Sequence, residues 1–191
     1  DRGLTMTYDS LTAEPHHLYY FAFAGTTNQS PDSRLVVRLT LRGNDVFHRA
    51  EGLSPEEATA VGLDGGEFIF KLPDGMDPAT LYGAAIPIDL SGVPTGLYTM
   101  VIEYGIFKLD GNGAFTSGGF STFSQPYALV NRHEDNFLGA GWGLNGILEL
   151  YSGDAGVLLV DGQGREEIYF APPEQGQPFT PFSSGDGNTL I

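Results

Sequence analysis

Apolar and polar residues alternate along much of this chain, which is the pattern of β-strands that bury one face and expose the other. The pattern is clearest over residues 34–42, which read RLVVRLTLR. The face that we expect to be buried carries Leu35, Val37, Leu39 and Leu41. The opposite face, which we expect to meet solvent, carries Arg34, Val36, Arg38, Thr40 and Arg42.

Further strand-like runs follow between turns rich in glycine, proline and aspartate. We predict strands over residues 3–8, 17–23, 34–42, 67–72, 81–90, 96–107, 114–122 and 126–131. One helix of about two turns is expected over residues 54–61, because Ser54 can cap it, Pro55 suits its first position and Glu57 completes a capping box. Many short strands with a single short helix indicate an all-β fold.

The form of this fold is suggested by residues 94–98, Pro-Thr-Gly-Leu-Tyr, which lead into a long alternating strand. A turn of this kind is common near the last strands of immunoglobulin-like and fibronectin-like sandwiches. We therefore predict an antiparallel β-sandwich of that type over residues 1–132. A smaller β-meander is expected over residues 133–170, and a tail rich in proline and glycine over residues 171–191.

Residues 137–170 carry a more specific pattern. Three short apolar runs (142–150, 155–160 and 166–170) are separated by turns, and the last turn contains Asp161, Gly164 and Arg165 in a D-x-x-G-R arrangement. This turn resembles the Tyr-Asp-x-x-Gly-Arg consensus of the RHS/YD-repeat family, with Val160 in the place of the tyrosine. The preceding GAGW and GVLLVDG segments resemble the leader before the first repeats in large bacterial proteins of that family.

The resemblance implies that the chain is part of a longer secreted or cell-surface protein. Asp161, Gly164 and Arg165 would set a structural turn, and the leader residues Trp142, Leu144, Leu148 and Leu150 would pack inward. The implied partner is the downstream YD-repeat β-shell of the same chain. The function that follows is a non-catalytic structural or interaction module, which caps that shell or links it to upstream domains.

The composition of the chain excludes several other classes of function. The net charge is −15 with only two lysines, so neither nucleic acid nor an anionic membrane surface is an expected partner. Cysteine is absent, which excludes disulfides and thiol chemistry, and no apolar run approaches the about 20 residues of a membrane span. Neither an H-E-x-x-H nor a G-x-S-x-G motif accompanies the four histidines. We therefore expect no catalytic residues, although a carboxylate pair of a hydrolase would be invisible in sequence.

The alternative hypothesis is a carbohydrate-binding or calcium-dependent adhesion domain. Sugars stack on exposed aromatic rings, for which Trp142, Tyr19 and Tyr20 are the candidates. Adjacent side chains of a strand point to opposite faces, so one of Tyr19 and Tyr20 should face away from the core. Asp110 and Asn112 offer alternating oxygen ligands in a glycine-rich loop, which makes calcium the one cofactor considered. The more ordinary interpretation of the same loop is a hairpin turn, in which Asn-Gly tolerates positive φ.

Overall fold

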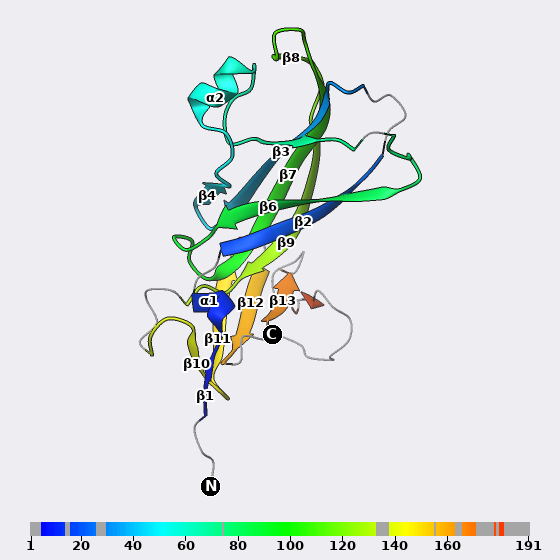
Figure 1. Ribbon diagram of the computed structural model, residues 1–191. Helices are drawn as coiled ribbons and strands as arrows, with labels where there is room; N and C mark the ends of the chain where they lie inside the picture. The colour runs from blue at the N-terminus through cyan, green and yellow to red at the C-terminus, as the bar shows by residue number, and fades with distance from the viewer. Residues whose placement is uncertain are drawn as a thin grey trace.

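The computed structural model describes residues 5–13, 16–25, 30–73, 75–132, 138–154, 156–162, 166–170, 178 and 180–181. Over these residues the sheets are antiparallel and both helices are short, which confirms the predicted all-β fold (Figure 1). The elements in chain order are β1 (Met6–Tyr8), α1 (Ser10–Ala13), β2 (His16–Ala24), β3 (Ser33–Gly43), β4 (Val46–Arg49), α2 (Pro55–Ala60), β5 (Phe68–Lys71), β6 (Leu81–Asp89), β7 (Gly96–Leu109), β8 (Phe115–Ser117), β9 (Ser121–Leu129), β10 (Trp142–Leu144), β11 (Leu148–Gly153), β12 (Gly156–Asp161), β13 (Glu166–Phe170) and β14 (Thr180–Pro181).

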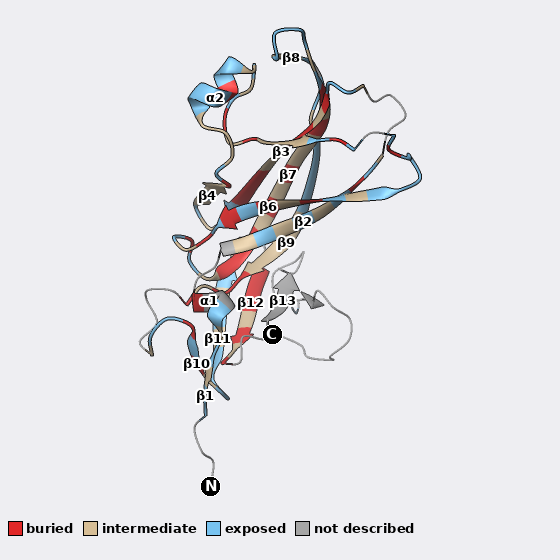
Figure 2. Cartoon of the chain, in the orientation of Figure 1, coloured by how far each residue is buried: buried red, intermediate tan, exposed pale blue. Residues whose placement is uncertain are grey.

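Two layers of strands form the larger, N-terminal part. In the first layer, β3 and β7 pair along most of their length, β4 and β5 lie on the free side of β3, and β8 and β9 lie on the free side of β7. The second layer is a two-stranded ribbon of β2 and β6, which crosses the first layer obliquely (Figure 1). Aliphatic side chains of both layers, among them Leu39, Ile86 and Ile102, share one buried core (Figure 2).

An immunoglobulin-like or fibronectin-like form of this arrangement stays a prediction, with which several of the observed strand pairings agree. In such sandwiches strands B and E pair in one sheet, while C, F and G pair in the other. Here β2 pairs with β6, β3 with β7, and β7 with β9, in that chain order. Strand A would lie beside strand B, yet among the described residues no strand pairs with the second edge of β2.

Tyr98 joins the turn before β7 to the core. Its ring is buried, and its hydroxyl donates a 2.7 Å hydrogen bond to the carbonyl oxygen of Pro94, four residues upstream. A tyrosine corner of this kind is a hallmark of immunoglobulin-like sandwiches. Burial raises the pKa of the Tyr98 hydroxyl, so it stays a donor across the physiological range.

We expect Tyr98→Phe to lower the free energy of unfolding by about 1 kcal/mol, because the hydrogen bond from the Tyr98 hydroxyl to the Pro94 carbonyl is lost while the ring packing is kept. Chemical denaturation of the variant and the parent chain measures this difference. A change within error of zero would mean that the hydroxyl does not hold the turn.

The second face of β3 is more buried than predicted. Val36 and Thr40 are almost completely inaccessible, and only Arg42 among the five residues of that face is exposed, so the prediction of a solvated face is wrong. Two segments fold over it. Residues 50–67 bring Glu67 and Asp64 to Arg38, and residues 115–120 bring the ring of Phe120 to within 4.3 Å of the Arg38 guanidinium. Alternation within the strand cannot reveal cover that comes from distant loops.

A second, smaller part lies at one end of the sandwich. Strands β11, β12, β13 and β14 form an antiparallel sheet, which packs through Leu158 and Val160 against Leu97 and Val130 of the larger part. The structure also places β1 here, since Met6–Tyr8 pairs with Trp142–Leu144. The predicted boundary at residue 132 put β1 with the sandwich instead. In the predicted tail, only residues 178 and 180–181 are described, and β14 there continues the sheet.

Candidate functional site

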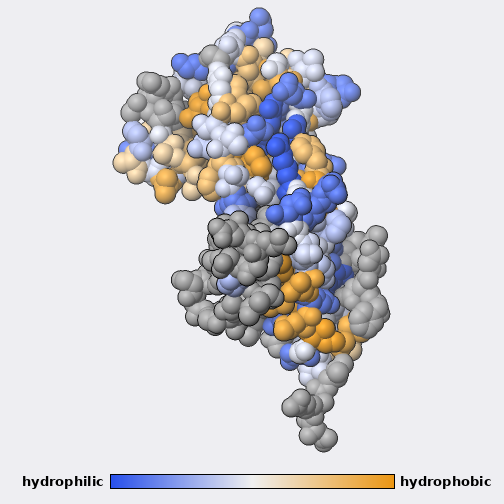
Figure 3. Space-filling model, turned by 180° about the vertical axis from the view of Figure 1, so that it is seen from behind, coloured by the Kyte–Doolittle hydropathy of each residue, from blue (hydrophilic) through white to orange (hydrophobic). Residues whose placement is uncertain are grey.

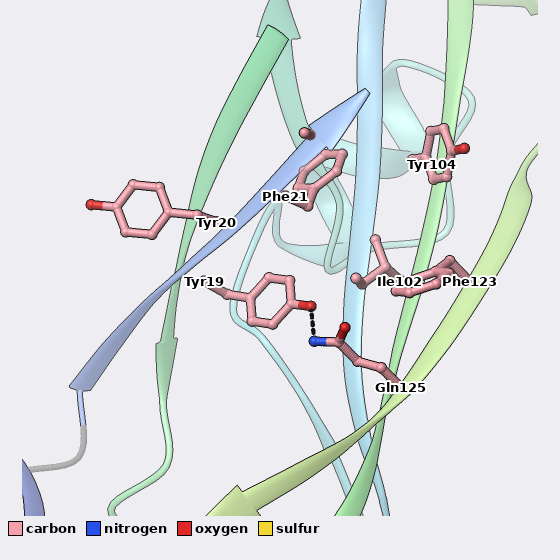
Figure 4. A pocket seen from close by; sticks show the side chains of 8 residues that line it. Tyr19, Tyr20, Phe21, Ile102, Tyr104, Phe123 and Gln125 are labelled. Carbon is pink, nitrogen blue, oxygen red and sulfur yellow. Dashed lines mark hydrogen bonds between the residues drawn. The ribbon is translucent and has the colours of Figure 1, made fainter. Parts of the chain in front are cut away.

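A pocket of about 340 Å³ opens at the seam between the two layers, beside the unpaired edge of β2 (Figure 4). Strand β2 contributes Tyr19, Tyr20, Phe21 and Ala22, and β7 contributes Ile102 and Tyr104. The remaining wall comes from Phe123 and Gln125 of β9. Rings therefore make up most of the lining, and hydroxyl and amide groups supply a few polar contacts, which is the usual make-up of a binding pocket.

Adjacent tyrosines of β2 take opposite roles, as the alternation of a strand requires. Tyr19 points into the pocket, where its hydroxyl accepts a hydrogen bond from the Gln125 amide (Figure 4). Burial raises the pKa of the Tyr19 hydroxyl, so this group stays neutral. Tyr20 points away from the other rings and is 70% exposed. Two of the three glycan candidates therefore line the same pocket, but only Tyr19 turns its ring into it.

Phe123 shows that this side of the core is incompletely covered. It lies opposite Ile102 in the β7–β9 register, and paired residues of an antiparallel ladder point to the same face of the sheet. Ile102 is buried under the ribbon, whereas Phe123 is 51% exposed. The ribbon of β2 and β6 therefore ends before it covers β9.

Trp142, the third glycan candidate, lies in the smaller part of the molecule. Its ring packs on Tyr8 at 5.4 Å between ring centroids and is 37% exposed. The contact joins β10 to β1, which is a structural role for the ring between Gly141 and Gly143. Trp142 shares no strand pair with the pocket residues, so the three predicted aromatic residues do not form one binding face.

Asp110 and Asn112, the calcium candidates, form a hairpin cap between β7 and β8. One carboxylate oxygen of Asp110, Oδ1, accepts the backbone N–H groups of Asn112 and Ala114 at 2.8 and 2.9 Å. This is the arrangement by which an aspartate closes a turn on its own backbone. Within the described part of the chain, no three histidine, aspartate or glutamate side chains are grouped so that they could hold a metal ion.

The predicted YD-like turn is described only in part. Asp161 ends β12 opposite Leu148, and its carbonyl oxygen accepts a hydrogen bond from Arg132 at 3.2 Å. Gly164 and Arg165 lie outside the described residues. Leu148 and Leu150 were expected to pack inward. This prediction is wrong, because their side chains are 65% and 54% exposed.

A polar cluster that the sequence did not suggest lies where the two parts meet. The buried Arg132 forms an ion pair with Glu149 at 3.6 Å, and Glu149 accepts the hydroxyl of Tyr151 at 3.0 Å. Burial, followed by the nearby Glu149 charge, raises the pKa of Tyr151. The cluster ties β11 to the end of the sandwich. Since Arg132 is distant in sequence from Glu149 and Tyr151 of β11, no local motif could have found the cluster.

Comparison with known proteins yields no relative. No family model matches the chain, and neither a curated protein nor a solved structure matches it significantly. No helix in the described segments has the length and apolarity to cross a bilayer.

Proposed function

We propose that this chain is a non-catalytic structural module of a large secreted or surface RHS/YD-repeat protein, and that it joins a β-sandwich to the first strands of the repeat shell. The observation that supports it most is the unequal burial of the two faces of the β11–β12 sheet. One face packs on the sandwich, whereas the other leaves apolar side chains open.

The two faces follow from alternation in β11 and β12. Leu158 and Val160 point toward the sandwich and are fully buried. Leu150 and Leu159 are cross-strand neighbours on the opposite face, and Leu148 lies two residues along. Apolar surface gathers over this part of the molecule (Figure 3). A half-covered sheet with an apolar open face favours further strands that pack on it, because exposed apolar patches mark interaction surfaces.

The contact between the β11–β12 sheet and the sandwich is suited to capping the first strands of a shell. The first strands of a shell present an edge whose free N–H and C=O groups recruit unwanted strands unless something covers it. Here β11 contacts β7 of the sandwich, and the cluster of Arg132, Glu149 and Tyr151 fixes it there. A sandwich held rigidly beside the first shell strands would supply such cover.

The test compares this chain with a longer one that also carries the residues following it in the parent protein. In the chain alone, the double variant Leu148→Thr/Leu150→Thr should change the free energy of unfolding by less than about 1 kcal/mol, because both side chains are already in water. In the longer chain, we expect a loss of about 2–4 kcal/mol, since the two leucines would then be buried.

The control for this experiment is Leu18→Thr, which replaces an equally exposed leucine on the other part of the molecule and should be neutral in both chains. Equal small effects of the double variant in the short and the long chain would contradict the shell proposal. Denaturant unfolding, followed by hydrogen exchange at β11 and β12, supplies both measurements.

The carbohydrate-binding and calcium alternatives have less support. Tyr19 and Tyr20 line one pocket with only the Tyr19 ring turned into it, Trp142 packs on Tyr8 elsewhere, and Asp110 already caps its own turn. Thermal unfolding with calcium and with soluble polysaccharides tests both alternatives, because a ligand that binds only the folded chain raises its melting midpoint.

A further inference from the structure

The unpaired edge of β2 is the second place where the molecule offers a surface that its own described strands leave open. Strand β2 is nine residues long and pairs along all of them with β6, but with no other described strand. Strand β9, in the facing layer, likewise pairs only with β7. Between these edges lies the pocket lined by Tyr19, Phe21 and Phe123.

The backbone of β2 defines what kind of molecule this edge can bind. The N–H of Gly25 bonds to the carbonyl of Thr80, which continues the β2–β6 register and makes these two residues a hydrogen-bonded pair. Such pairs alternate along an antiparallel ladder. The N–H and C=O groups of Leu18, Tyr20 and Ala22 therefore point away from β6, toward the open edge. A row of donors and acceptors at this spacing is matched by the backbone of another extended peptide.

The side chains along the edge indicate an apolar ligand. Toward the core, an added strand would meet the half-exposed Phe123 and the rings of Tyr19 and Tyr104. Except at one end of the ribbon, where Asp89 lies opposite His16 in the register, the outward face also carries no charged or amide side chain. Its other members are Leu18, Tyr20, Ala22 and Ala24 of β2 and Leu81, Gly83, Ala85 and Pro87 of β6. Leu18, Tyr20 and Leu81 are each more than half exposed.

The charges around the edge indicate a basic ligand. Asp89 is exposed at one end of the ribbon, opposite His16, and Asp77 is exposed at the other end, beside Gly25. The whole chain carries a net charge of −15. A second copy of the same chain would bring the same negative charge, whereas a strand with lysine or arginine at its ends would be attracted.

We propose that the free edge of β2 is a docking site for an extended strand of a different polypeptide, apolar in its centre and basic at both ends. The strand adds to the β2–β6 ribbon, extends its cover over Phe123, and fills the pocket at the seam. This site is separate from the exposed β11–β12 face, and it stands whether or not that face leads into a repeat shell.

The probe is the fluorescein-labelled peptide KKVTVTVKK, with blocked ends and the length of β2, titrated with the whole chain in fluorescence anisotropy. We expect saturable binding, protection of the Leu18, Tyr20 and Ala22 amides from hydrogen exchange, and much weaker binding of EEVTVTVEE and of the strand-breaking KKVTPTVKK. No binding of the first peptide at millimolar protein would overturn the proposal.

Two variants locate the binding. Ala22→Pro removes an N–H at the open edge, where proline is tolerated in strands, and should weaken binding about tenfold or more. Ala22→Ser keeps that N–H and should bind within about twofold of the parent chain. If Ala22→Pro fails to fold by circular dichroism, Phe123→Ser replaces it, because this half-exposed side chain can be removed with little loss of core packing.

Three results would contradict the proposal in different ways. Equal binding to the parent chain and to Ala22→Pro would exclude the edge. A polysaccharide that binds the parent chain and competes with the peptide, but is insensitive to Ala22→Pro, would make the pocket a glycan site. Dimerisation that Ala22→Pro abolishes would make a second copy the occupant.

Discussion

Replacing Glu67 by glutamine is expected to lower the free energy of unfolding by about 3 kcal/mol, among the largest effects of any single substitution in this chain. Glu67 is fully buried, and its carboxylate accepts hydrogen bonds from Arg38 Nε and Nη2 at 2.8 and 2.6 Å. It also accepts the backbone N–H groups of Asp64 and Gly65. Glutamine keeps the volume but removes the charge, which leaves the guanidinium of Arg38 poorly compensated.

Arg38 shows why the buried partner matters more than the exposed one. Burial by itself lowers the pKa of Arg38, but the hydrogen bonds and charges of Glu67 and Asp64 outweigh it and leave the pKa raised. Asp64 bonds to the same guanidinium at 2.7 Å, yet its side chain is 82% exposed. Solvent screens such a pair, so Asp64→Asn should cost no more than about 1 kcal/mol.

Denaturant unfolding of both variants is the measurement. Equal losses for Glu67→Gln and Asp64→Asn would contradict the burial of Glu67 as the cause. The double variant Arg38→Met/Glu67→Leu adds a second check, because a buried ion pair replaced by apolar residues is often neutral for stability. A loss in the double variant as large as in Glu67→Gln would mean that packing, and not the lost charge, is responsible.

Local sequence patterns predicted the helix and most of the strands, but they missed β4 and divided β9 between two predicted strands. The helix α2 begins after Ser54 with the predicted capping box, since Ser54 and Glu57 exchange hydrogen bonds across residues close in sequence. The alternation of residues 34–42 gave the core face of β3 correctly, because the period of a strand is local. The pairings β2–β6 and β3–β7 were beyond such reasoning, since each joins segments separated by more than fifty residues.

The candidate sites were predicted less completely, for a related reason. The sequence singled out Tyr19 and Tyr20, and alternation correctly required one of them to face outward. It did not find Phe123 or Gln125 as pocket residues, because they reach Tyr19 only through the packing of β9 against β2. It also grouped Trp142 with the tyrosines, although the pairing of β1 with β10 puts that ring elsewhere.

The stability of the smaller part of the molecule depends on a close approach between the backbone of β10 and the turn after β12. In the sequence, the only sign of this approach is the glycines at the two positions. Gly162 follows Asp161 at the end of β12 and is buried. A methyl group built on Gly162 would overlap the carbonyl group of Leu144, at the end of β10. A methyl group built on Gly143, in β10, would likewise come too close to the Gly162 carbonyl and the Arg132 guanidinium. The turn after β12 and strand β10 therefore cross at a distance that only glycine allows.

Gly162→Ala should consequently destabilise the sheet of β11 and β12 by about 3 kcal/mol, because backbone atoms, unlike the end of a flexible side chain, cannot move aside cheaply. Hydrogen exchange should accelerate at the amides of β12 and remain unchanged at the central β3–β7 pair, if the two parts open separately. We expect β12 to exchange faster than β3 in the parent chain as well. Uniform acceleration over both parts would mean that they unfold as one unit.

The control for this prediction is Gly92→Ala, in the turn between β6 and β7. A methyl group there meets no atom within 4 Å, so the variant should unfold like the parent chain. If Gly162→Ala is as stable as Gly92→Ala, the backbones of β10 and of the turn after β12 have room for a methyl group between them. The attachment of the sheet to the sandwich would then rest on Leu158, Val160 and the Arg132 cluster alone, and Leu158→Ala would become the substitution with the largest effect on it.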